Sequence, residues 1–203
     1  MERAASRILL ASSNPGKLRE FQALARDVAS SVEVRALPGI ETLADFHEDS
    51  PTFGENALGK ALHYSRHTAD PVFSDDSGLV VPALGGRPGV RSARYAGANA
   101  SNEQRIEKLL RELGGRSGKE RQAHFVCVIA LAMQGQAAAV VSERVDGLLL
   151  EAPRGSGGFG YDPVFYFPQL NRTFAELAPE EKNQHSHRGK ALRRLLAALP
   201  GVL

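Results

Sequence analysis

The pattern of hydrophobic and polar residues at the start of the chain predicts strands separated by a helix. A short apolar run predicts a strand over 7–12. The segment over 15–28 has the spacing of a helix and carries Pro15 in its first turn, where a missing N–H costs nothing. The pattern over 32–37 predicts another strand. The chain therefore opens as strand, loop, helix and strand.

A further helix is predicted over 53–68, after a polar stretch over 41–51 that is typical of a loop. Its apolar positions are Ala57, Ala61 and Tyr64, and its polar positions are Asn56, Lys60, His63 and His67. The polar residues stand three or four apart, so they share one helix face that is available for chemistry. Gly54 and Gly59 weaken this helix, each costing about 0.5–1 kcal/mol relative to alanine.

The rest of the chain predicts a mixed sheet with flanking helices. The expected elements are a helix over 101–113, long strands over 124–133 and 137–150, a short strand over 164–167 and a last helix over 189–199. Ser101 is the expected N-cap of the first of these helices, and Gly114 ends it. The two long strands flank the turn Gln134-Gly135, a pattern that predicts an antiparallel hairpin.

Composition limits the classes of protein that fit. The chain of 203 residues is 42% hydrophobic, enough to bury the core of one large domain, or of two lobes that share a sheet. Its formal net charge of +2 gives no reason to expect nucleic-acid binding. No apolar stretch approaches the roughly 20 residues that cross a bilayer, and the N-terminus has no signal-peptide core. We therefore expect a cytoplasmic protein without membrane contact.

Three segments carry candidate chemistry, and the first follows the first predicted strand. It consists of Ser12, Ser13, Asn14, Pro15, Gly16 and Lys17. A turn from a strand into a helix presents free backbone N–H groups to an anion, so a phosphate is one interpretation. It is not a Walker loop, because the first glycine is missing and Leu18 replaces the hydroxyl residue. An ordinary turn with a solvated lysine stays open.

The second segment is the acidic pair Asp75-Asp76, which lies between apolar residues and is expected at a strand end or tight turn. Carboxylates at the edge of a core are costly unless a cation or donor meets them, and a divalent metal is the natural cation. A turn in which an aspartate caps backbone N–H groups is the alternative. If the pair lies in a strand, the two side chains point to opposite faces, so one would ligate and the other support.

The third segment is glycine-rich and aromatic, and a donor-rich tail accompanies it. Phe159, Gly160, Tyr161 and Asp162 combine an aromatic surface for a base with backbone that a ligand can approach closely. The tail over 182–190 includes Lys182, His187 and Arg188, whose donors suit carbonyl or phosphate oxygens. A hairpin exit and a solvated helix start are the alternatives.

As a set, these motifs resemble the inosine triphosphate pyrophosphatase family, also called XTP/dITP diphosphatases, over nearly the whole chain. The matching segments are 12–17, 52–61, 74–79, 88–97, 158–165 and 186–192. The resemblance implies one domain over 1–203 with an α/β fold: an elongated mixed sheet with flanking helices and two lobes around a nucleotide cleft. It also implies a homodimer that uses Mg²⁺.

The reaction implied by this resemblance converts ITP, dITP or XTP and water into the monophosphate and pyrophosphate. Asp76 would hold magnesium and activate water for attack at the α-phosphorus, with Asp75 beside it. Lys17 and Lys60 would meet the polyphosphate. The residues implied in substrate binding are Ser12, Ser13, Asn14, Pro15, Gly16, Lys17, Asn56, Ser77, Phe159, Gly160, Tyr161, Asp162, Lys182, His187 and Arg188.

One departure from the family concerns the metal. Members often carry two adjacent acidic residues before the Thr-Phe motif, and this chain has His47-Glu48 there. We expect Glu48 to assist magnesium and His47 not to. Two other functions stay open: a pyrophosphatase for modified pyrimidine nucleotides, and a nucleotide-binding module without turnover.

Overall fold

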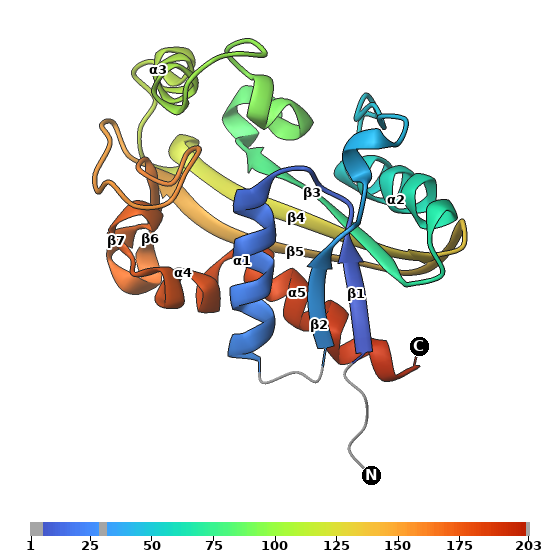
Figure 1. The fold of residues 1–203 in the computed structure, drawn as a ribbon. Coiled ribbons are helices and arrows are strands. Elements are labelled where there is room, and N and C mark those ends of the chain that lie inside the picture. The colour runs from blue at the N-terminus through green and yellow to red at the C-terminus, as the bar shows by residue number, and fades with distance from the viewer. Residues whose placement is uncertain (1–5, 29–31, 202–203) are drawn as a thin grey trace. The chain divides into compact units, whose positions relative to one another are not determined.

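The structure, a computed structural model, describes residues 6–28 and 32–201 (Figure 1). In the described residues, the strands form one sheet in the order β2-β1-β3-β4-β5-β6-β7. The strands are β1 (Ser6–Leu10), β2 (Val32–Ala36), β3 (Val72–Val80), β4 (Gln122–Met133), β5 (Gln136–Leu149), β6 (Phe165–Phe167) and β7 (Arg172–Thr173). The α-helices are α1 (Pro15–Asp27), α2 (Phe53–Tyr64), α3 (Asn102–Leu113), α4 (Pro179–His185) and α5 (His187–Ala198).

The sheet is mixed, as predicted. Strand β1 runs parallel to β2 and β3, whereas β6 is antiparallel to β5 and β7. The predicted hairpin joins the neighbouring strands β4 and β5 through Gln134 and Gly135. Both turn residues have positive φ, 50° and 79°, the pairing that two-residue hairpin loops of type I′ require.

Contacts between residues divide the chain into two compact units. The first unit contains Met1–Asp76, Cys127–Glu143 and Arg188–Leu203, and the second contains Ser77–Val126 and Arg144–His187. Strands β3, β4 and β5 contribute residues to both units.

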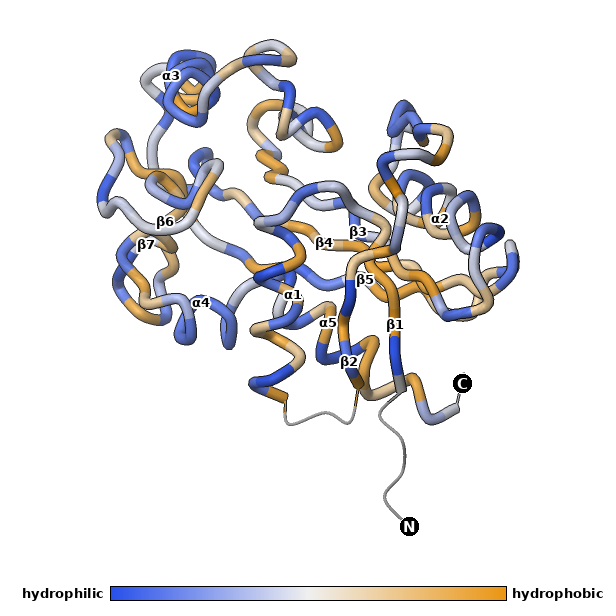
Figure 2. Tube along the Cα trace, in the orientation of Figure 1, coloured by the Kyte–Doolittle hydropathy of each residue, from blue (hydrophilic) through white to orange (hydrophobic). Residues whose placement is uncertain are grey.

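In the first unit, helices cover both faces of the sheet. Alternate side chains of β1 point to opposite faces and pack against different helices. Ile8 and Leu10 belong to a buried cluster with Phe21 of α1 and Leu192 of α5. Leu9 belongs to another cluster, which includes Tyr64 of α2 and Val72 of β3. A strand buried on both faces is apolar at successive positions, and Figure 2 shows hydrophobic residues along β1 and β4. Cys127 lies in this core, where burial raises the pKa of its thiol.

The second unit has its own core, built around α3. Ser101 caps this helix through a reciprocal capping box with Gln104, and Gly114 ends it, as predicted. Its residues Ile106, Leu109 and Leu113 are buried with aromatic residues from β4, from β6 and from the turn after β7. These aromatic residues are Phe125, Phe165, Phe167 and Phe174.

Three features differ from the sequence predictions. Asp75 and Asp76 lie inside β3, not at a strand end or tight turn. The last helix begins at His187 instead of residue 189. Helix α4 and the two-residue strand β7 were not predicted. Neither α4 nor β7 is long enough to develop a clear hydrophobic period.

A buried arginine, Arg121, supports the second unit through hydrogen bonds to backbone carbonyls. Arg121, 8% exposed, donates from Nε to the carbonyl of Leu149 at 2.6 Å and from Nη2 to that of Leu150 at 2.7 Å. Its Nη1 donates to the carbonyl of Arg116 at 3.2 Å. The guanidinium therefore satisfies the carbonyls where β5 ends.

Arg121→Met should destabilise the protein, because it leaves buried carbonyls without donors. Each such group costs about 1–3 kcal/mol, so we expect a loss of about 2–4 kcal/mol in the free energy of unfolding. Urea denaturation followed by circular dichroism measures it. Lys119→Met is the matched control, since Lys119 is exposed and should change stability by less than about 0.5 kcal/mol. Equal stability of the two variants would contradict the supporting role.

Candidate active site

The predicted strand–loop–helix turn is present, and Asn14 is the N-cap of α1. Asn14 Oδ1 accepts hydrogen bonds from the backbone N–H groups of Gly16, at 2.8 Å, and Lys17, at 3.3 Å. The Asn14 N–H in turn donates to Ser12 Oγ at 3.2 Å. Two of the N–H groups expected to bind an anion are thus already capped. A phosphate must bind beside this cap or replace it.

Asp75 is the centre of an ion-pair network in the first unit. Its Oδ1 lies 2.9 Å from Lys17 Nζ and its Oδ2 lies 3.5 Å from Arg188 Nη2. Arg188 Nη1 also lies 2.7 Å from Glu20 Oε2. Since Lys17 and Glu20 stand one turn apart on α1, the network links this helix, β3 and α5.

The network determines the charge state of Asp75. Burial alone would raise the pKa of this carboxyl, but the cations Lys17 and Arg188 outweigh it and hold the pKa well below its usual range. Asp75 therefore stays ionised at all physiological pH values. A carboxylate so fully paired with cations is a poor base and suits a supporting role.

Asp76 has the opposite character. Its Oδ2 accepts a hydrogen bond from Asn56 Nδ2 of α2 at 2.9 Å. Burial raises the pKa of Asp76 to about 6; the hydrogen bond from Asn56 opposes this rise, and the charges of Glu48 and Asp75 add to it. A carboxylate with a pKa near neutrality is suited to accept a proton. The two aspartates thus have different environments, which fits their alternation along a strand.

Glu48 and Lys60 form an ion pair in the first unit. Glu48 Oε1 and Lys60 Nζ lie 2.5 Å apart, and the side chains are 29% and 15% exposed. The predicted metal carboxylate and the predicted polyphosphate lysine thus contact each other. A metal at Glu48 or a phosphate at Lys60 would compete with this pair.

The oxygen donors here suit a hard divalent cation. Asp76 and Glu48 offer carboxylate oxygens, the ligands that Mg²⁺ prefers. Among the described residues, no cluster of three or more His, Cys, Asp or Glu side chains could hold a metal ion. Mg²⁺ commonly takes one or two carboxylates and completes its shell with water and substrate phosphates. The residues present therefore fit magnesium bound together with a phosphorylated ligand.

The glycine-rich loop of the second unit is organised by Asp162. This buried carboxylate accepts hydrogen bonds at Oδ2 from the Phe159 N–H, at 2.7 Å, and from Lys182 Nζ, at 2.6 Å. Lys182 Nζ also lies 4.7 Å from the centre of the Phe159 ring. A side chain on residue 158 would lie 2.2 Å from Asp162 Oδ2, so the loop needs Gly158.

The two aromatic residues of this loop have different environments. Phe159 is 52% exposed, whereas Tyr161 is 3% exposed and donates its hydroxyl to the Ser92 carbonyl at 3.0 Å. Phe159 is therefore the aromatic side chain of this loop that is accessible to a ligand, whereas Tyr161 belongs to the core. A cavity of about 570 Å³ lies beside Phe159 and Gly160, with Ile106 of α3 in its wall.

The donor-rich tail forms the junction of α4 and α5. Lys182 lies in α4, and His187 and Arg188 begin α5. His187 is 6% exposed and stacks on Phe125, with ring centres 4.7 Å apart and planes 8° apart. The tail is therefore largely packed and not a solvated helix start.

The units divide the predicted site residues between them. The first unit holds Ser12, Ser13, Asn14, Pro15, Gly16, Lys17, Glu48, Asn56, Lys60, Asp75, Asp76 and Arg188. The second holds Ser77, Phe159, Gly160, Tyr161, Asp162, Lys182 and His187. Within the first unit, the structure brings Lys17, Asp75 and Arg188 together, and also Asn56 and Asp76.

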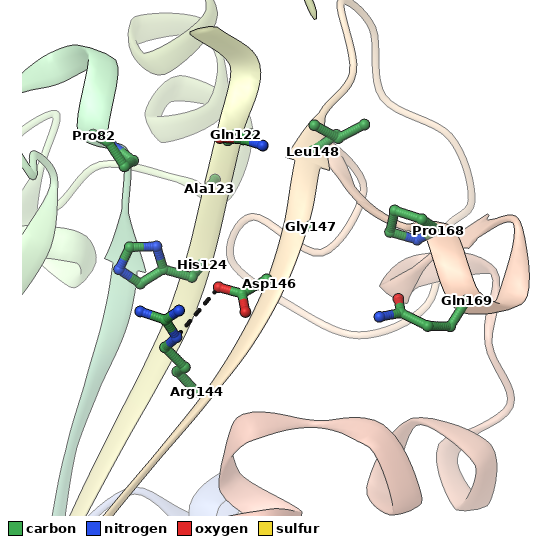
Figure 3. A pocket seen from close by; sticks show the side chains of 10 residues that line it. All are labelled: Pro82, Gln122, Ala123, His124, Arg144, Asp146, Gly147, Leu148, Pro168 and Gln169. Atoms are coloured by element: carbon green, nitrogen blue, oxygen red, sulfur yellow. Dashed lines mark ion pairs between the residues drawn. The ribbon is translucent and has the colours of Figure 1, made fainter. Parts of the chain in front are cut away.

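A different cavity, of about 620 Å³, contains none of the predicted residues. Figure 3 shows its lining in the second unit, where His124 and Arg144 lie on neighbouring strands. Arg144 Nε pairs with Asp146 Oδ1 at 3.4 Å, and both side chains are about two-thirds exposed, 64% and 65%. Because this ion pair is solvated, it is not evidence that the cavity binds a ligand.

Comparison with known proteins identifies the family. A family model described as the Ham1 family matches residues 8–198. The chain belongs to the Ham1 family. This Ham1 chain is 54% identical over 188 residues to a dITP/XTP pyrophosphatase of Geobacillus kaustophilus, covering 93% of this chain and 91% of that one. It is 47% identical over 197 residues to a dITP/XTP pyrophosphatase of Thermus thermophilus, covering 95% and 91%.

Solved structures agree with this assignment. A HAM1 protein from Coxiella burnetii matches this Ham1 chain with a TM-score of 0.85 and 43% identity, over 97% of this chain and 99% of that one. A dITP/XTP pyrophosphatase from Mycobacterium abscessus matches with a TM-score of 0.76 and 41% identity, over 94% and 98%. The predicted family and the predicted α/β fold with a mixed sheet are confirmed.

One residue of this site was missed in the sequence. Glu20 pairs with Arg188 and was not among the predicted residues. A local signal existed, because Glu20 stands three positions after Lys17 in a predicted helix and must share its face. Its partner lies 168 positions away, so the sequence pattern could not supply the reason for a carboxylate there.

The raised pKa of Asp76 predicts a pH dependence. Above about pH 6 the carboxyl is ionised, and below it a proton occupies the group that would bind a cation or accept a proton. With subsaturating Mg²⁺ we expect kcat/KM to fall about tenfold per pH unit below that pKa. A cation favours the ionised form, so the midpoint should move to lower pH as Mg²⁺ increases.

Initial rates between pH 4.5 and 8 at several Mg²⁺ concentrations measure this shift, and circular dichroism at each pH checks that the protein stays folded. A midpoint that ignores the Mg²⁺ concentration would contradict the assignment.

Proposed function

We propose that this protein hydrolyses ITP, dITP and XTP to the monophosphate and pyrophosphate, and so removes non-standard purines from the nucleotide pool. The observation that carries the proposal is the Asp75-Asp76 pair. One carboxylate is held ionised by Lys17 and Arg188, and its neighbour has a pKa of about 6. The names of the relatives supply the substrate class.

In the proposed reaction, the Asp76 carboxylate takes a proton from water as the water oxygen bonds to the α-phosphorus. The bond from that phosphorus to the bridging oxygen breaks, and pyrophosphate leaves with its electron pair. Asn56 orients Asp76 through its hydrogen bond. Asp76 and Glu48 would hold Mg²⁺, which offsets the negative charge on the phosphate oxygens.

The polyphosphate is assigned to cations of the first unit. Lys17 stands in the first turn of α1, where the helix dipole also favours an anion. Lys60 contributes a second ammonium once Glu48 releases it. The turn over 12–16 supplies backbone and hydroxyl donors around Lys17. Several donors that share the negative charge orient the α-phosphorus for attack.

Base recognition is assigned mainly to the second unit. Phe159 offers its exposed face for stacking, and Lys182 and His187 are assigned as donors for the 6-oxo group of hypoxanthine or xanthine. Arg188 of the first unit is assigned to the same role and would have to share its guanidinium with Asp75 and Glu20. Adenine presents an amino group at that position, so a donor would face a donor. A buried unpaired donor costs about 1–3 kcal/mol, or roughly tenfold to a hundredfold in rate.

We also propose that the protein is a single domain over 1–203, forms a homodimer and is cytoplasmic. Within the described residues, every helix is too short or too polar to span a bilayer. Light scattering coupled to gel filtration measures the oligomeric state.

The proposal is tested by product analysis with Mg²⁺ and, separately, ITP, XTP, dITP, GTP, ATP and dUTP. We expect pyrophosphate, without orthophosphate, from the 6-oxopurines ITP, XTP and dITP, far ahead of ATP. Asp76→Asn is the matched control, since it keeps the side-chain volume and should lose at least about a thousandfold in kcat. Preference for dUTP would favour modified pyrimidines, and binding without turnover would favour a binding module.

Substitution of Lys182 and of Lys60 should change kcat/KM for ITP and ATP in different ways. Lys182→Met removes a donor from the base side, so the ratio of kcat/KM for ITP over ATP should fall about tenfold to a hundredfold. Lys60→Met removes a phosphate contact that all nucleotides share, so both values should fall together and leave the ratio unchanged. Steady-state kinetics with both nucleotides measures this, and an unchanged ratio in Lys182→Met would place base recognition elsewhere.

A further inference from the structure

The segment over 44–50, which carries Glu48, has no helix or strand of its own. Its position therefore depends on side-chain contacts instead of ladder hydrogen bonds. Several of these contacts reach α2. At one end, His63 Nε2 lies 2.8 Å from the Ala44 carbonyl oxygen. At the other end, the Ser50 N–H donates to Asn56 Oδ1 at 3.0 Å.

Between these ends, Phe46 is the one large apolar residue of the segment. Its ring is partly buried against the cluster that contains Leu9, Tyr64 and Val72. The ring centre also lies 5.9 Å from that of His63. Burial of this aromatic ring is therefore the main apolar contact that holds the segment on α2.

The ring sits directly over Gly59. A Cβ atom on residue 59 would lie 2.6 Å from Phe46 Cζ, which is closer than real Cβ atoms come, and 3.1 Å from Cε2, which is a tight contact. Any side chain at this position would displace the ring. Gly59 was predicted only to weaken the helix, but its missing side chain leaves the space that the Phe46 ring occupies.

This contact lies next to the metal and phosphate groups. Glu48, two residues after Phe46, pairs with Lys60, the residue after Gly59. Asn56 joins Ser50 to Asp76, because its Oδ1 accepts from Ser50 and its Nδ2 donates to Asp76 at 2.9 Å. The segment and α2 together thus set the placement of Glu48 relative to Asp76.

We infer that Phe46, seated on Gly59, is a positioning residue that holds the Glu48 carboxylate in place for the divalent cation. This rests on the proposed function for the role of Glu48 at the metal. Phe46 contacts neither cation nor substrate in this inference. It acts by fixing the position of the segment over 44–50, which has no regular structure, along the axis of α2.

Gly59→Ala tests this inference, and Gly54→Ala is its matched control. Both changes add one methyl group to the same helix, but a Cβ on residue 54 meets nothing closer than Thr52 Oγ1 at 4.0 Å. Hydrogen exchange of peptides over 44–50 reports the position of the segment. Mn²⁺ binding in the presence of pyrophosphate, followed by electron paramagnetic resonance, reports the cation site without turnover.

In Gly59→Ala we expect exchange over 44–50 to become about tenfold faster and Mn²⁺ binding to weaken about tenfold. Gly54→Ala should change neither. Phe46→Val combined with Gly59→Ala should recover most of the Mn²⁺ affinity, because the smaller side chain leaves room for the methyl group. If Gly59→Ala does not fold, Phe46→Val alone should accelerate exchange and weaken Mn²⁺ binding.

Identical behaviour of Gly59→Ala and Gly54→Ala would overturn the inference. So would faster exchange with unchanged Mn²⁺ affinity, since the segment would then be loose without consequence for the cation. Both measurements are independent of nucleotide hydrolysis. If wild-type protein releases no pyrophosphate from ITP while these shifts occur, the proposed function fails and the positioning role stands.

Discussion

The burial of two adjacent carboxylates in β3 is the constraint on which the first unit depends. A buried carboxylate is costly unless cations or donors meet it. Asp75 is 1% exposed and draws Lys17 from α1 and Arg188 from α5 to one point. Asp76 is 7% exposed and draws Asn56 from α2. The helices on both faces of the sheet are thus tied to neighbouring residues of one strand.

This arrangement gives the two carboxylates different pKa values: Asp75 stays ionised, and Asp76 has a pKa near neutrality. Two like charges on neighbouring residues disfavour ionisation of both. Here Lys17 and Arg188 stabilise the charge of Asp75, whereas burial first and then the charges of Glu48 and Asp75 raise the pKa of Asp76. The charge of Asp75 is therefore one of the causes of the raised pKa of Asp76.

Sequence patterns predicted most long elements because their periods are clear. Strand β1, helices α1 and α3 and the β4–β5 hairpin lie within a few residues of their predicted bounds. The patterns failed where a local preference was overridden. Aspartate favours turns, so Asp75 and Asp76 were expected outside a strand, and only partners from distant helices make their place in β3 tolerable.

The same limit applies to the site. Motifs identified Lys17, Lys60 and Asp76, but pairings between distant segments could not be predicted from spacing. Glu20 and Phe46 illustrate this, because each has its reason in a partner on another element. The packing of Tyr161 in the core could not be read from its motif either, since the hydrogen bond to Ser92 spans 69 positions.

Under the proposed function, the ion pair between Glu48 and Lys60 has a thermodynamic consequence for the order in which metal and nucleotide bind. A cation that arrives alone must compete with the Lys60 ammonium, and a phosphate that arrives alone must compete with the Glu48 carboxylate. When both arrive as one complex, a single opening of the pair frees both groups, and its cost is met once instead of twice. Metal and polyphosphate are then positively coupled ligands, each raising the affinity of the other by the same factor. The ion pair thereby favours the metal–nucleotide complex over either component, and the coupling also weakens the hold on each product component once the other has left.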